Sequence, residues 1–171
     1  MPPQPTLVCL GDCCIDAYLP PIGRGFAGGS AANAAVAASA GGLSSACAGW
    51  VGSDPAGEAI LRLLAARAVD TSRLLLHPGP TRRVPIRVTP QGHQFAHELM
   101  PPRRPFQPTA EMLDFARGAA LVHLNWLDDP LQAAPTLSAP GGPRLALDYG
   151  QHSPAALLDA TLPAVEVAFF A

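Results

Sequence analysis

The chain has 171 residues, of which 49% are hydrophobic and only 14% are charged, which predicts a globular protein with a sizeable core and excludes a disordered one. The formal net charge of −2 argues against binding to nucleic acid or to an anionic membrane surface. All eleven basic residues are arginine, which excludes Schiff-base chemistry and a P-loop lysine within these residues.

Cysteine usage and hydropathy indicate a reducing, cytoplasmic compartment. Three of the four cysteines lie within six residues and no two C-x-x-C motifs combine, so neither a disulfide framework nor a zinc site is expected. Cys9 lies in an apolar strand pattern and is expected to be a small buried hydrophobe. No basic region precedes the first apolar run and no apolar stretch reaches transmembrane length, so we expect no signal peptide and no membrane span.

Two carboxylates follow the first expected strand. The apolar run at residues 6–11 ends in glycine and predicts a buried strand, after which Asp12 and Asp16 occur. Carboxylates just past the carboxyl end of a central strand lie where open α/β sheets bind ligands. The alternative is a turn-forming Asp12 with a solvated Asp16. Residues 19–25, rich in proline and glycine, predict a loop or the start of a projecting strand.

The strongest local signal is the stretch 26–42, in which glycine pairs enclose a run of small helix formers. Ser30 is the predicted N-cap, so Asn33 falls in the first turn, where backbone N–H groups are unpaired and the helix dipole is positive. Gly28 and Gly29 have no Cβ and would let a ligand approach the backbone. The pattern favours a polyhydroxylated or anionic small molecule. Close packing of helix on sheet also explains the glycines, and on spacing alone it is the favoured interpretation.

The middle of the chain continues the alternation of strands and helices. Residues 46–52 and 69–76 predict strands. Between them, Asp54 and Pro55 predict the start of a helix whose residues facing the core are Ile60, Leu61, Leu63, Leu64 and Ala68.

A different pattern follows at residues 81–97, where apolar and polar residues alternate around a P-Q-G turn. This predicts a β-hairpin that projects as a flap over a site. Arg82, Arg83 and Arg87 either bind an anion there or form a solvated edge that discourages aggregation.

The last third of the chain predicts one further helix and three strands. Thr109 caps a helix that runs through Arg117 and stops at Gly118, and two shorter helices are expected to break at Pro135 and Pro163. The apolar runs 120–126, 145–149 and 165–170 predict buried strands. The alternation gives right-handed βαβ units and a parallel sheet. Because no element follows the last strand, it is either an edge strand or part of a longer design, and we favour the second interpretation.

Four motifs in this order resemble the N-terminal half of a ribokinase-like (phosphofructokinase B) carbohydrate kinase: G-D-C-C-I-D at 11–16, G-G-S-A-A-N at 28–33, G-W-V-G-S-D-P-A-G-E at 49–58 and A-V-D-T-S at 68–72. The resemblance implies an α/β fold, with a Rossmann-like parallel sheet, helices on both faces and a small β lid. Residues 1–171 then form the substrate-binding portion, with lid strands around 19–27 and 81–98.

The resemblance also implies an activity, the transfer of the ATP γ-phosphoryl group to a sugar hydroxyl with Mg²⁺. Asp16 and Asn33 would then hydrogen-bond sugar hydroxyls, and Gly28 and Gly29 would let the sugar lie against the backbone. Asn125 would be a further sugar contact by its position alone.

Within the family the sequence is most similar to the fructoselysine/fructosamine 6-kinases, through G-D-x-C-x-D-x-Y, F-x-G-G-x-A-x-N, A-G-W-V-G-x-D and L-V-H. Asp54 and Gly57 are expected to be structural, capping and packing the second helix. In this family the lid often mediates dimers, so the resemblance names the lid as the candidate surface for a homodimer; the sequence itself does not fix the oligomeric state.

The sequence departs from the family in having no G-A-G-D motif, which carries the catalytic base and the anion hole, and no adenine-binding region. We therefore expect no catalytic residue and no metal ligand in this chain, no turnover by it alone, and no role for Asp16 as the catalytic base. The alternatives are a non-catalytic sugar-binding module and a truncated remnant that folds poorly. An oxidoreductase is disfavoured because no G-x-G-x-x-G follows the first strand.

Overall fold

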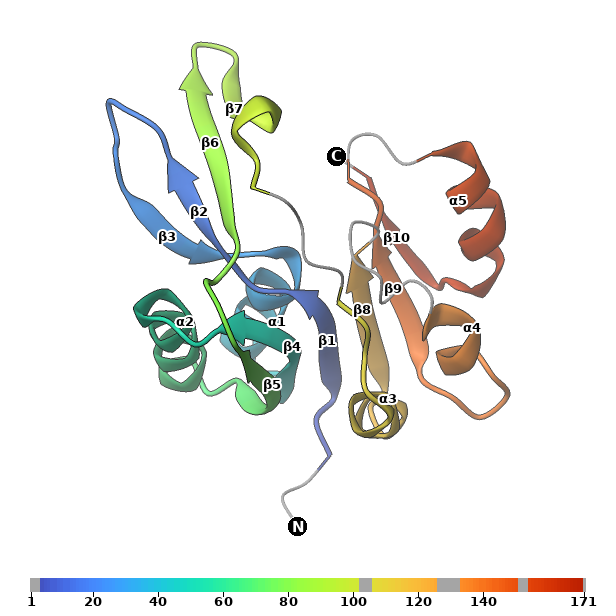
Figure 1. Ribbon diagram of the computed structural model, residues 1–171. Helices are drawn as coiled ribbons and strands as arrows, with labels where there is room; N and C mark the ends of the chain where they lie inside the picture. Colours follow the sequence, from blue (N-terminus) through green and yellow to red (C-terminus); the bar gives the residue numbers. More distant parts are fainter. Residues whose placement is uncertain (1–3, 102–105, 126–132, 151–153, 171) are drawn as a thin grey trace.

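A six-stranded parallel sheet forms the body of the protein in the computed structural model, which describes residues 4–101, 106–125, 133–150 and 154–170. In sheet order, the strands are β10 (Val167–Phe169), β9 (Arg144–Asp148), β8 (Leu121–Asn125), β1 (Leu7–Asp12), β4 (Ser45–Gly52) and β5 (Asp70–His77), and every neighbouring pair is parallel. The predicted α/β class with a parallel sheet is confirmed (Figure 1).

A separate mixed sheet stands beyond the carboxyl end of β1 (Figure 1). Its strands, in order, are β3 (Gly25–Gly28), β2 (Cys14–Tyr18), β6 (Arg83–Thr89) and β7 (Gly92–Phe95). The hairpin expected around the P-Q-G turn is β6–β7. The first lid strand, expected around residues 19–27, is instead a pair of strands on either side of a turn, and β2 begins already at Cys14.

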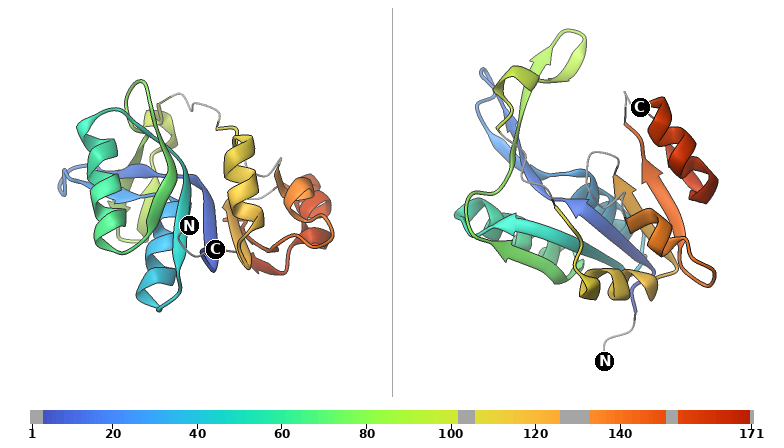
Figure 2. Two further views of the ribbon diagram at one scale, coloured as in Figure 1. Left: turned by 90° about the horizontal axis from the view of Figure 1, so that it is seen from below. Right: turned by 45° about the vertical axis from the view of Figure 1, so that its right-hand side comes forward.

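Helices cover both faces of the large sheet (Figure 2). Helices α1 (Ser30–Ala40) and α2 (Pro55–Ala66) pack on one face, and α3 (Ala110–Arg117), α4 (Ala134–Leu137) and α5 (Ala155–Thr161) pack on the other. Two short 3₁₀ turns lie at His97–Leu99 and Leu162–Ala164.

Alternation along β1 separates the two cores. Leu7 and Cys9 join the core under α1 and α2, whereas Val8 and Leu10 join the core under α3 and α4. The thiol of Cys9 is fully buried, as expected, and all four cysteines are free.

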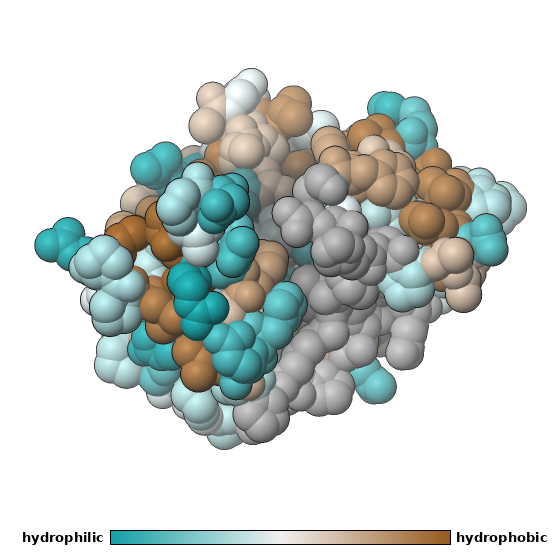
Figure 3. All heavy atoms as spheres, turned by 90° about the horizontal axis from the view of Figure 1, so that it is seen from above, coloured by the Kyte–Doolittle hydropathy of each residue, from teal (hydrophilic) through white to brown (hydrophobic). Residues whose placement is uncertain are grey.

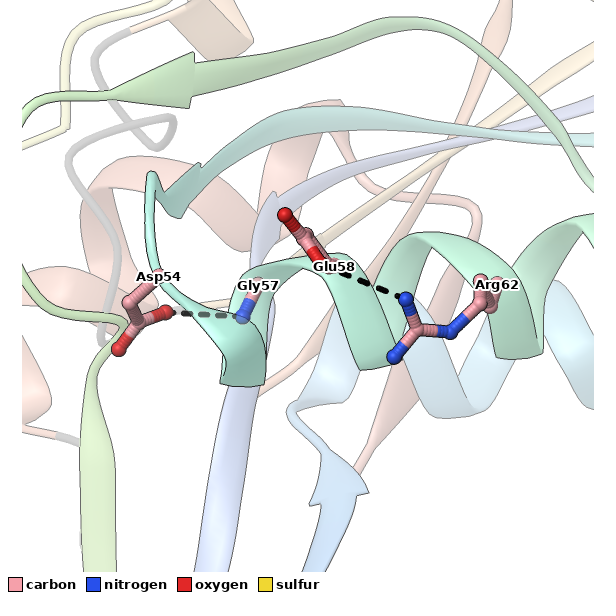
Figure 4. Close-up of polar contacts among 4 residues, drawn as sticks. All are labelled: Asp54, Gly57, Glu58 and Arg62. Atoms are coloured by element: carbon pink, nitrogen blue, oxygen red, sulfur yellow. Dashed lines mark hydrogen bonds and ion pairs between the residues drawn. The ribbon is translucent and has the colours of Figure 1, made fainter.

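Asp54 caps the start of α2 and ties it to Thr81, which precedes strand β6 of the small sheet. Its Oδ1 accepts a hydrogen bond from the Gly57 N–H at 2.9 Å and one from the Thr81 hydroxyl at 2.5 Å, and its Oδ2 accepts one from the Thr81 N–H at 3.1 Å. A Cβ at Gly57 would lie 2.0 Å from the carbonyl oxygen of Gly52, so only glycine fits there. The capping and packing roles predicted for Asp54 and Gly57 are confirmed (Figure 4).

Two helix-end predictions are wrong. Ser30 is not the N-cap of α1: Gly29 is, with no side-chain cap hydrogen bond, and Ser30 is the first helical residue. The Ser30 hydroxyl instead forms hydrogen bonds with His123 and Asp148, which lie on two strands of the large sheet. Ala68 does not face the core, because α2 ends at Ala66 and Ala68 is exposed in the left-handed region at φ 55°. Leu61 and Leu63 are only partly buried, and Ile60 and Leu64 are the buried members of the set.

Two predictions for the last third are also wrong. Pro135 does not break α4 but lies in its first turn, where a missing N–H costs no helical hydrogen bond. The apolar run at 165–170 forms the short strand β10 at the edge of the sheet, which is one of the two alternatives; the expected burial is wrong, because Phe169 is 50% and Phe170 61% exposed. Trp126, included in the expected strand 120–126, lies outside the described residues.

We predict that Asp54→Ala lowers the free energy of unfolding by about 1–2 kcal/mol, as expected for the loss of an N-cap. The matched control is Glu58→Ala, which removes the exposed pair with Arg62 on the same helix and should cost less than about 0.5 kcal/mol (Figure 4). Urea unfolding at pH 7 measures both, and equal losses would contradict the role given to Asp54.

The same pair of variants carries a pH signature. Hydrogen bonds from Thr81 and Gly57 hold the pKa of Asp54 below its ordinary value. The stabilisation by Asp54 is therefore complete above the ordinary pKa of an aspartate and is lost as pH falls through the lowered pKa. The difference in free energy of unfolding between wild type and Asp54→Ala should therefore become smaller as pH falls. Urea unfolding at a series of acidic pH values would measure this difference.

Candidate functional site

Asp16 lies on β2, close to the junction of the two sheets. Only Cys13 separates β1 from β2, so the chain passes directly from the carboxyl end of a central strand into the small sheet. Asp16 pairs with Phe26 across the antiparallel β2–β3 ladder. The carboxylate expected past the end of the first strand is therefore carried by a strand and not by a loop.

The carboxyl group of Asp16 rests against the backbone of Gly28. A Cβ at Gly28 would lie 2.2 Å from Asp16 Oδ2, so any other residue would displace the carboxyl group. Asp16 Oδ1 accepts a hydrogen bond from the thiol of Cys14 at 3.6 Å. The room left by the glycine is thus taken by a side chain of the protein, which fixes where the carboxyl oxygens lie.

Burial raises the pKa of Asp16 above its ordinary value. The hydrogen bond from Cys14 opposes this rise, the nearby Asp12 carboxylate adds to it, and Arg82 opposes it. Burial also raises the pKa of the Cys14 thiol, which keeps its proton available for the bond to Asp16.

An ion pair links the two sheets beside this carboxyl group. Arg82, which leads into β6, donates a hydrogen bond through Nη1 to Asp12 Oδ2 at the end of β1, and each side chain is 18% exposed. Of the three arginines considered as anion ligands, Arg82 therefore pairs with a carboxylate of the chain itself. Arg87 pairs with Glu98 at 2.7 Å, and Arg83 is exposed.

The start of α1 brings the second predicted sugar contact to the same end of the sheet. Gly29 has φ 98°, and a Cβ there would lie 2.4 Å from the carbonyl oxygen of Asp12, so this position demands glycine on two counts. Asn33 lies in the first turn with an exposed side chain, and its backbone N–H donates to the Gly29 carbonyl at 2.9 Å.

Asn125 ends β8 and is buried. Its neighbour in register on β9 is Asp148. His123, two residues earlier on the same strand, shares its face of the sheet, and His123 is hydrogen-bonded to Ser30 of α1. Asn125 therefore lies on the face of the sheet that is covered by α1, the helix that carries Asn33.

A polar cluster of Ser30, His123 and Asp148 was not predicted from the sequence. The Ser30 hydroxyl lies 3.2 Å from His123 Nε2 and donates to Asp148 Oδ2 at 3.2 Å. Burial lowers the pKa of His123, although Asp148 acts in the opposite direction. These residues lie 93 and 118 positions apart in the sequence, and no local pattern connects them.

A groove of about 570 Å³ runs beside α1 over the strands β8–β10. Its polar lining comes from Ser30, Asn33, His123 and Asp148, and Phe169 and Phe170 contribute exposed aromatic rings. Asn33 also lines a smaller hollow of about 290 Å³ between α1 and α2. Viewed from above, hydrophobic side chains gather both over the small sheet and over the C-terminal elements (Figure 3).

In the described ranges, no group of three or more His, Cys, Asp or Glu residues is placed to hold a metal ion. The full sequence contains no G-A-G-D motif. No chemical step through ATP or Mg²⁺ is therefore assigned to this chain. Among the described helices, none is long and apolar enough to cross a membrane.

The model of the pfkB family carbohydrate kinases matches residues 4–125, which is more than half of the chain. The chain belongs to the pfkB family of carbohydrate kinases. The matched region contains Asp16, Gly28, Gly29 and Asn33 and ends at Asn125.

Similar proteins agree with this family and extend further than the chain does. Fructoselysine 6-kinase of Escherichia coli is 27% identical over 164 residues, which are 96% of this chain and 62% of that protein. The chain thus spans less than two thirds of the curated relatives it matches.

Two solved structures share the fold. Ribokinase of Arabidopsis thaliana, complexed with ribose and ATP, matches this chain with a TM-score of 0.76 at 21% identity. The matched region is 98% of this chain and 60% of the ribokinase chain. Fructokinase of Vibrio cholerae, bound to fructose, ADP and calcium ion, has a TM-score of 0.68 at 20% identity, with the same coverage of 98% and 60%. The ribokinase-like fold expected from the sequence is confirmed.

We predict that Asp16→Asn stabilises the chain at pH 7 by about 0.5 kcal/mol, a small value because solvent still screens a half-buried carboxyl group. A raised pKa means that the ionised form is disfavoured by folding, so the contribution of Asp16 to stability falls as pH rises through its folded-state pKa. Thermal unfolding at pH 4 and pH 7 should show a gain for Asp16→Asn at pH 7 that shrinks at pH 4. A loss of stability at pH 7 would contradict the burial cost assigned to this carboxylate.

Proposed function

We propose that this chain is the sugar-binding half of a kinase that uses ATP to phosphorylate a hydroxyl of a sugar or a sugar amine. The observation that carries the proposal is the Asp16 carboxyl group, held half-buried against Gly28 at the junction of the two sheets. An ionised carboxylate accepts hydrogen bonds from hydroxyl groups, and burial strengthens each such bond.

We extend the proposal to the other sugar contacts expected from the sequence. Asn33 offers an amide that both donates and accepts, from the first turn of α1. Asn125 offers a second amide from the end of β8. Gly28 and Gly29 shape the backbone that the sugar would face, and the small sheet would close over it as a lid.

ATP and Mg²⁺ belong to the complete enzymes of the family, and the G-A-G-D motif of those enzymes does not occur in this sequence. The γ-phosphoryl transfer depends on positioning and charge stabilisation that the G-A-G-D segment supplies in the family. We therefore assign no catalytic residue here and expect no phosphoryl transfer by the 171-residue chain.

For the substrate, we favour a fructosamine such as fructoselysine, on the basis of the motifs shared with that subgroup and the 27% identity to a fructoselysine 6-kinase. The exposed apolar side chains of the small sheet, Phe26, Val88 and Phe95, support a homodimer through the lid. The Cys13 and Cys47 thiols share a hydrogen bond at 3.3 Å and are not joined by a disulfide, which supports a reducing cytoplasmic location.

A second function is a sugar-binding module without chemistry, which the absence of the G-A-G-D motif favours. The remaining alternative is a remnant that folds poorly. The exposed rings of Phe169 and Phe170 on the edge strand are the observation behind it, because an unprotected apolar edge promotes aggregation.

Calorimetric titration with D-fructose and with fructoselysine tests the sugar site. We predict that the wild-type chain binds, that Asp16→Ala weakens binding by about tenfold to a hundredfold, and that the control Asp114→Ala leaves it unchanged. Asp114 is an exposed carboxylate paired with Arg117 on α3, far along the chain from the site. Equal affinity of wild type and Asp16→Ala would contradict the proposal.

The same samples separate the alternatives. Incubation with ATP, Mg²⁺ and sugar should yield no phosphorylated sugar, and turnover would contradict the absence of catalytic residues. Sugar binding by a monodisperse chain whose natural form has a mass of 17.7 kDa would favour the binding module. Aggregation with no binding would favour the remnant.

A further inference from the structure

The first residue of α1 is tied by its side chain to two strands of the large sheet. The Ser30 hydroxyl donates to Asp148 Oδ2 on β9 and lies 3.2 Å from His123 Nε2 on β8. A hydroxyl has one proton, and here Asp148 receives it. The bond to His123 must therefore run from the Nε2–H to the Ser30 oxygen, which fixes the imidazole as the neutral Nε2–H tautomer or as the cation.

The order of these groups excludes a nucleophilic triad. In a Ser-His-Asp triad the histidine lies between the other two and takes the proton of the serine. Here the serine lies between the other two, and the histidine donates to it. His123 is only 8% exposed, whereas Ser30 and Asp148 are part-buried and line the groove beside α1. The arrangement holds groups in place and does not activate a nucleophile.

The network joins the elements that carry two of the proposed sugar contacts. Ser30 lies one helical turn before Asn33 on α1. His123 precedes Asn125 by two residues on β8, and Asp148 is the register neighbour of Asn125 on β9. The N-cap Gly29 provides no side-chain hydrogen bond, so the Ser30 hydroxyl is a side-chain link at this end of the helix.

The second oxygen of the Asp148 carboxylate, Oδ1, extends the network to the backbone. Asp148 Oδ1 accepts a hydrogen bond from the Gly150 N–H at 3.0 Å, which leaves Oδ2 to face Ser30. A carboxylate anchored at one oxygen presents the other in a fixed direction. The position of the α1 start thus depends on the end of β9.

We propose that Ser30, acting through His123 and Asp148, is a positioning residue that holds Asn33 and Asn125 at the separation the sugar requires. The inference rests on the proposed function for the roles of the two asparagines. Ser30 itself touches no substrate in this account. Loss of its hydroxyl would let the start of α1 move relative to β8 and would weaken sugar binding without removing any contacting group.

The test compares Ser30→Ala with Ser39→Ala and Ser30→Thr. Ser39 lies at the other end of α1, and its hydroxyl donates to the Arg67 carbonyl at 2.5 Å, so the control also loses one hydrogen bond of the same helix. Ser30→Thr keeps the hydroxyl. NMR hydrogen exchange of the backbone amides of Asn33 and Asn125 reports how firmly the start of α1 and the end of β8 are held in the absence of sugar. Calorimetry reports the affinity for fructoselysine.

We expect Ser30→Ala to speed backbone amide exchange at Asn33 and Asn125 by about tenfold and to weaken sugar binding about fivefold to tenfold, as for the loss of one member of a part-buried hydrogen-bond network. Ser30→Thr should restore both quantities, and Ser39→Ala should change neither. Exchange at Asn33 and Asn125 that is equal in Ser30→Ala and Ser39→Ala would overturn the inference.

The outcomes separate the inference from the proposed function. A wild-type chain that binds no sugar would overturn the function, and the exchange rates would still decide the positioning role. A chain whose binding is lost in Asp16→Ala but unchanged in Ser30→Ala would overturn the inference alone. If Ser30→Ala does not fold, Asp148→Asn replaces it, because it removes the charged acceptor and keeps the side-chain shape.

Discussion

The carboxyl group of Asp16 fills the space beside Gly28 that any Cβ would occupy, and the candidate site is arranged around this contact. The contact lies where β3 ends, just before α1 begins. Gly29, with its positive φ and its close approach to the Asp12 carbonyl, then turns the chain into the helix. One pair of glycines therefore places a carboxylate, a helix start and the end of β1 together.

Among the described residues, Arg82 supplies the positive charge that balances the carboxylates at this junction. Arg82 neutralises Asp12 and lies near enough to Asp16 to oppose the rise in its pKa. Because Arg82 enters β6 while Asp12 ends β1, the same ion pair joins the small sheet to the large one. Movement of the small sheet would thus be coupled electrostatically to the carboxylate that we assign to the sugar.

Local sequence patterns predicted the features that depend on local chemistry: the cap at Asp54, the hairpin around the P-Q-G turn and the parallel alternation. They failed where distant residues decide. Serine is a common N-cap residue, but the hydroxyl of Ser30 forms hydrogen bonds with His123 of β8 and Asp148 of β9. The last strand is as apolar as a core strand, but no described element covers its outer side, and Phe169 stays half exposed. Neither the hydrogen bonds of Ser30 nor the exposure of β10 can be predicted from the residues next to them in the sequence.

The most direct test of the account is a titration of the ¹⁵N-labelled wild-type chain with fructoselysine, followed residue by residue in NMR spectra. We expect the largest shift changes at Asp16, Gly28, Asn33 and Asn125, which the fold brings to one end of the large sheet. Changes confined to the hollow between α1 and α2, or to the edge strand β10, would contradict the central claim that this junction binds the sugar.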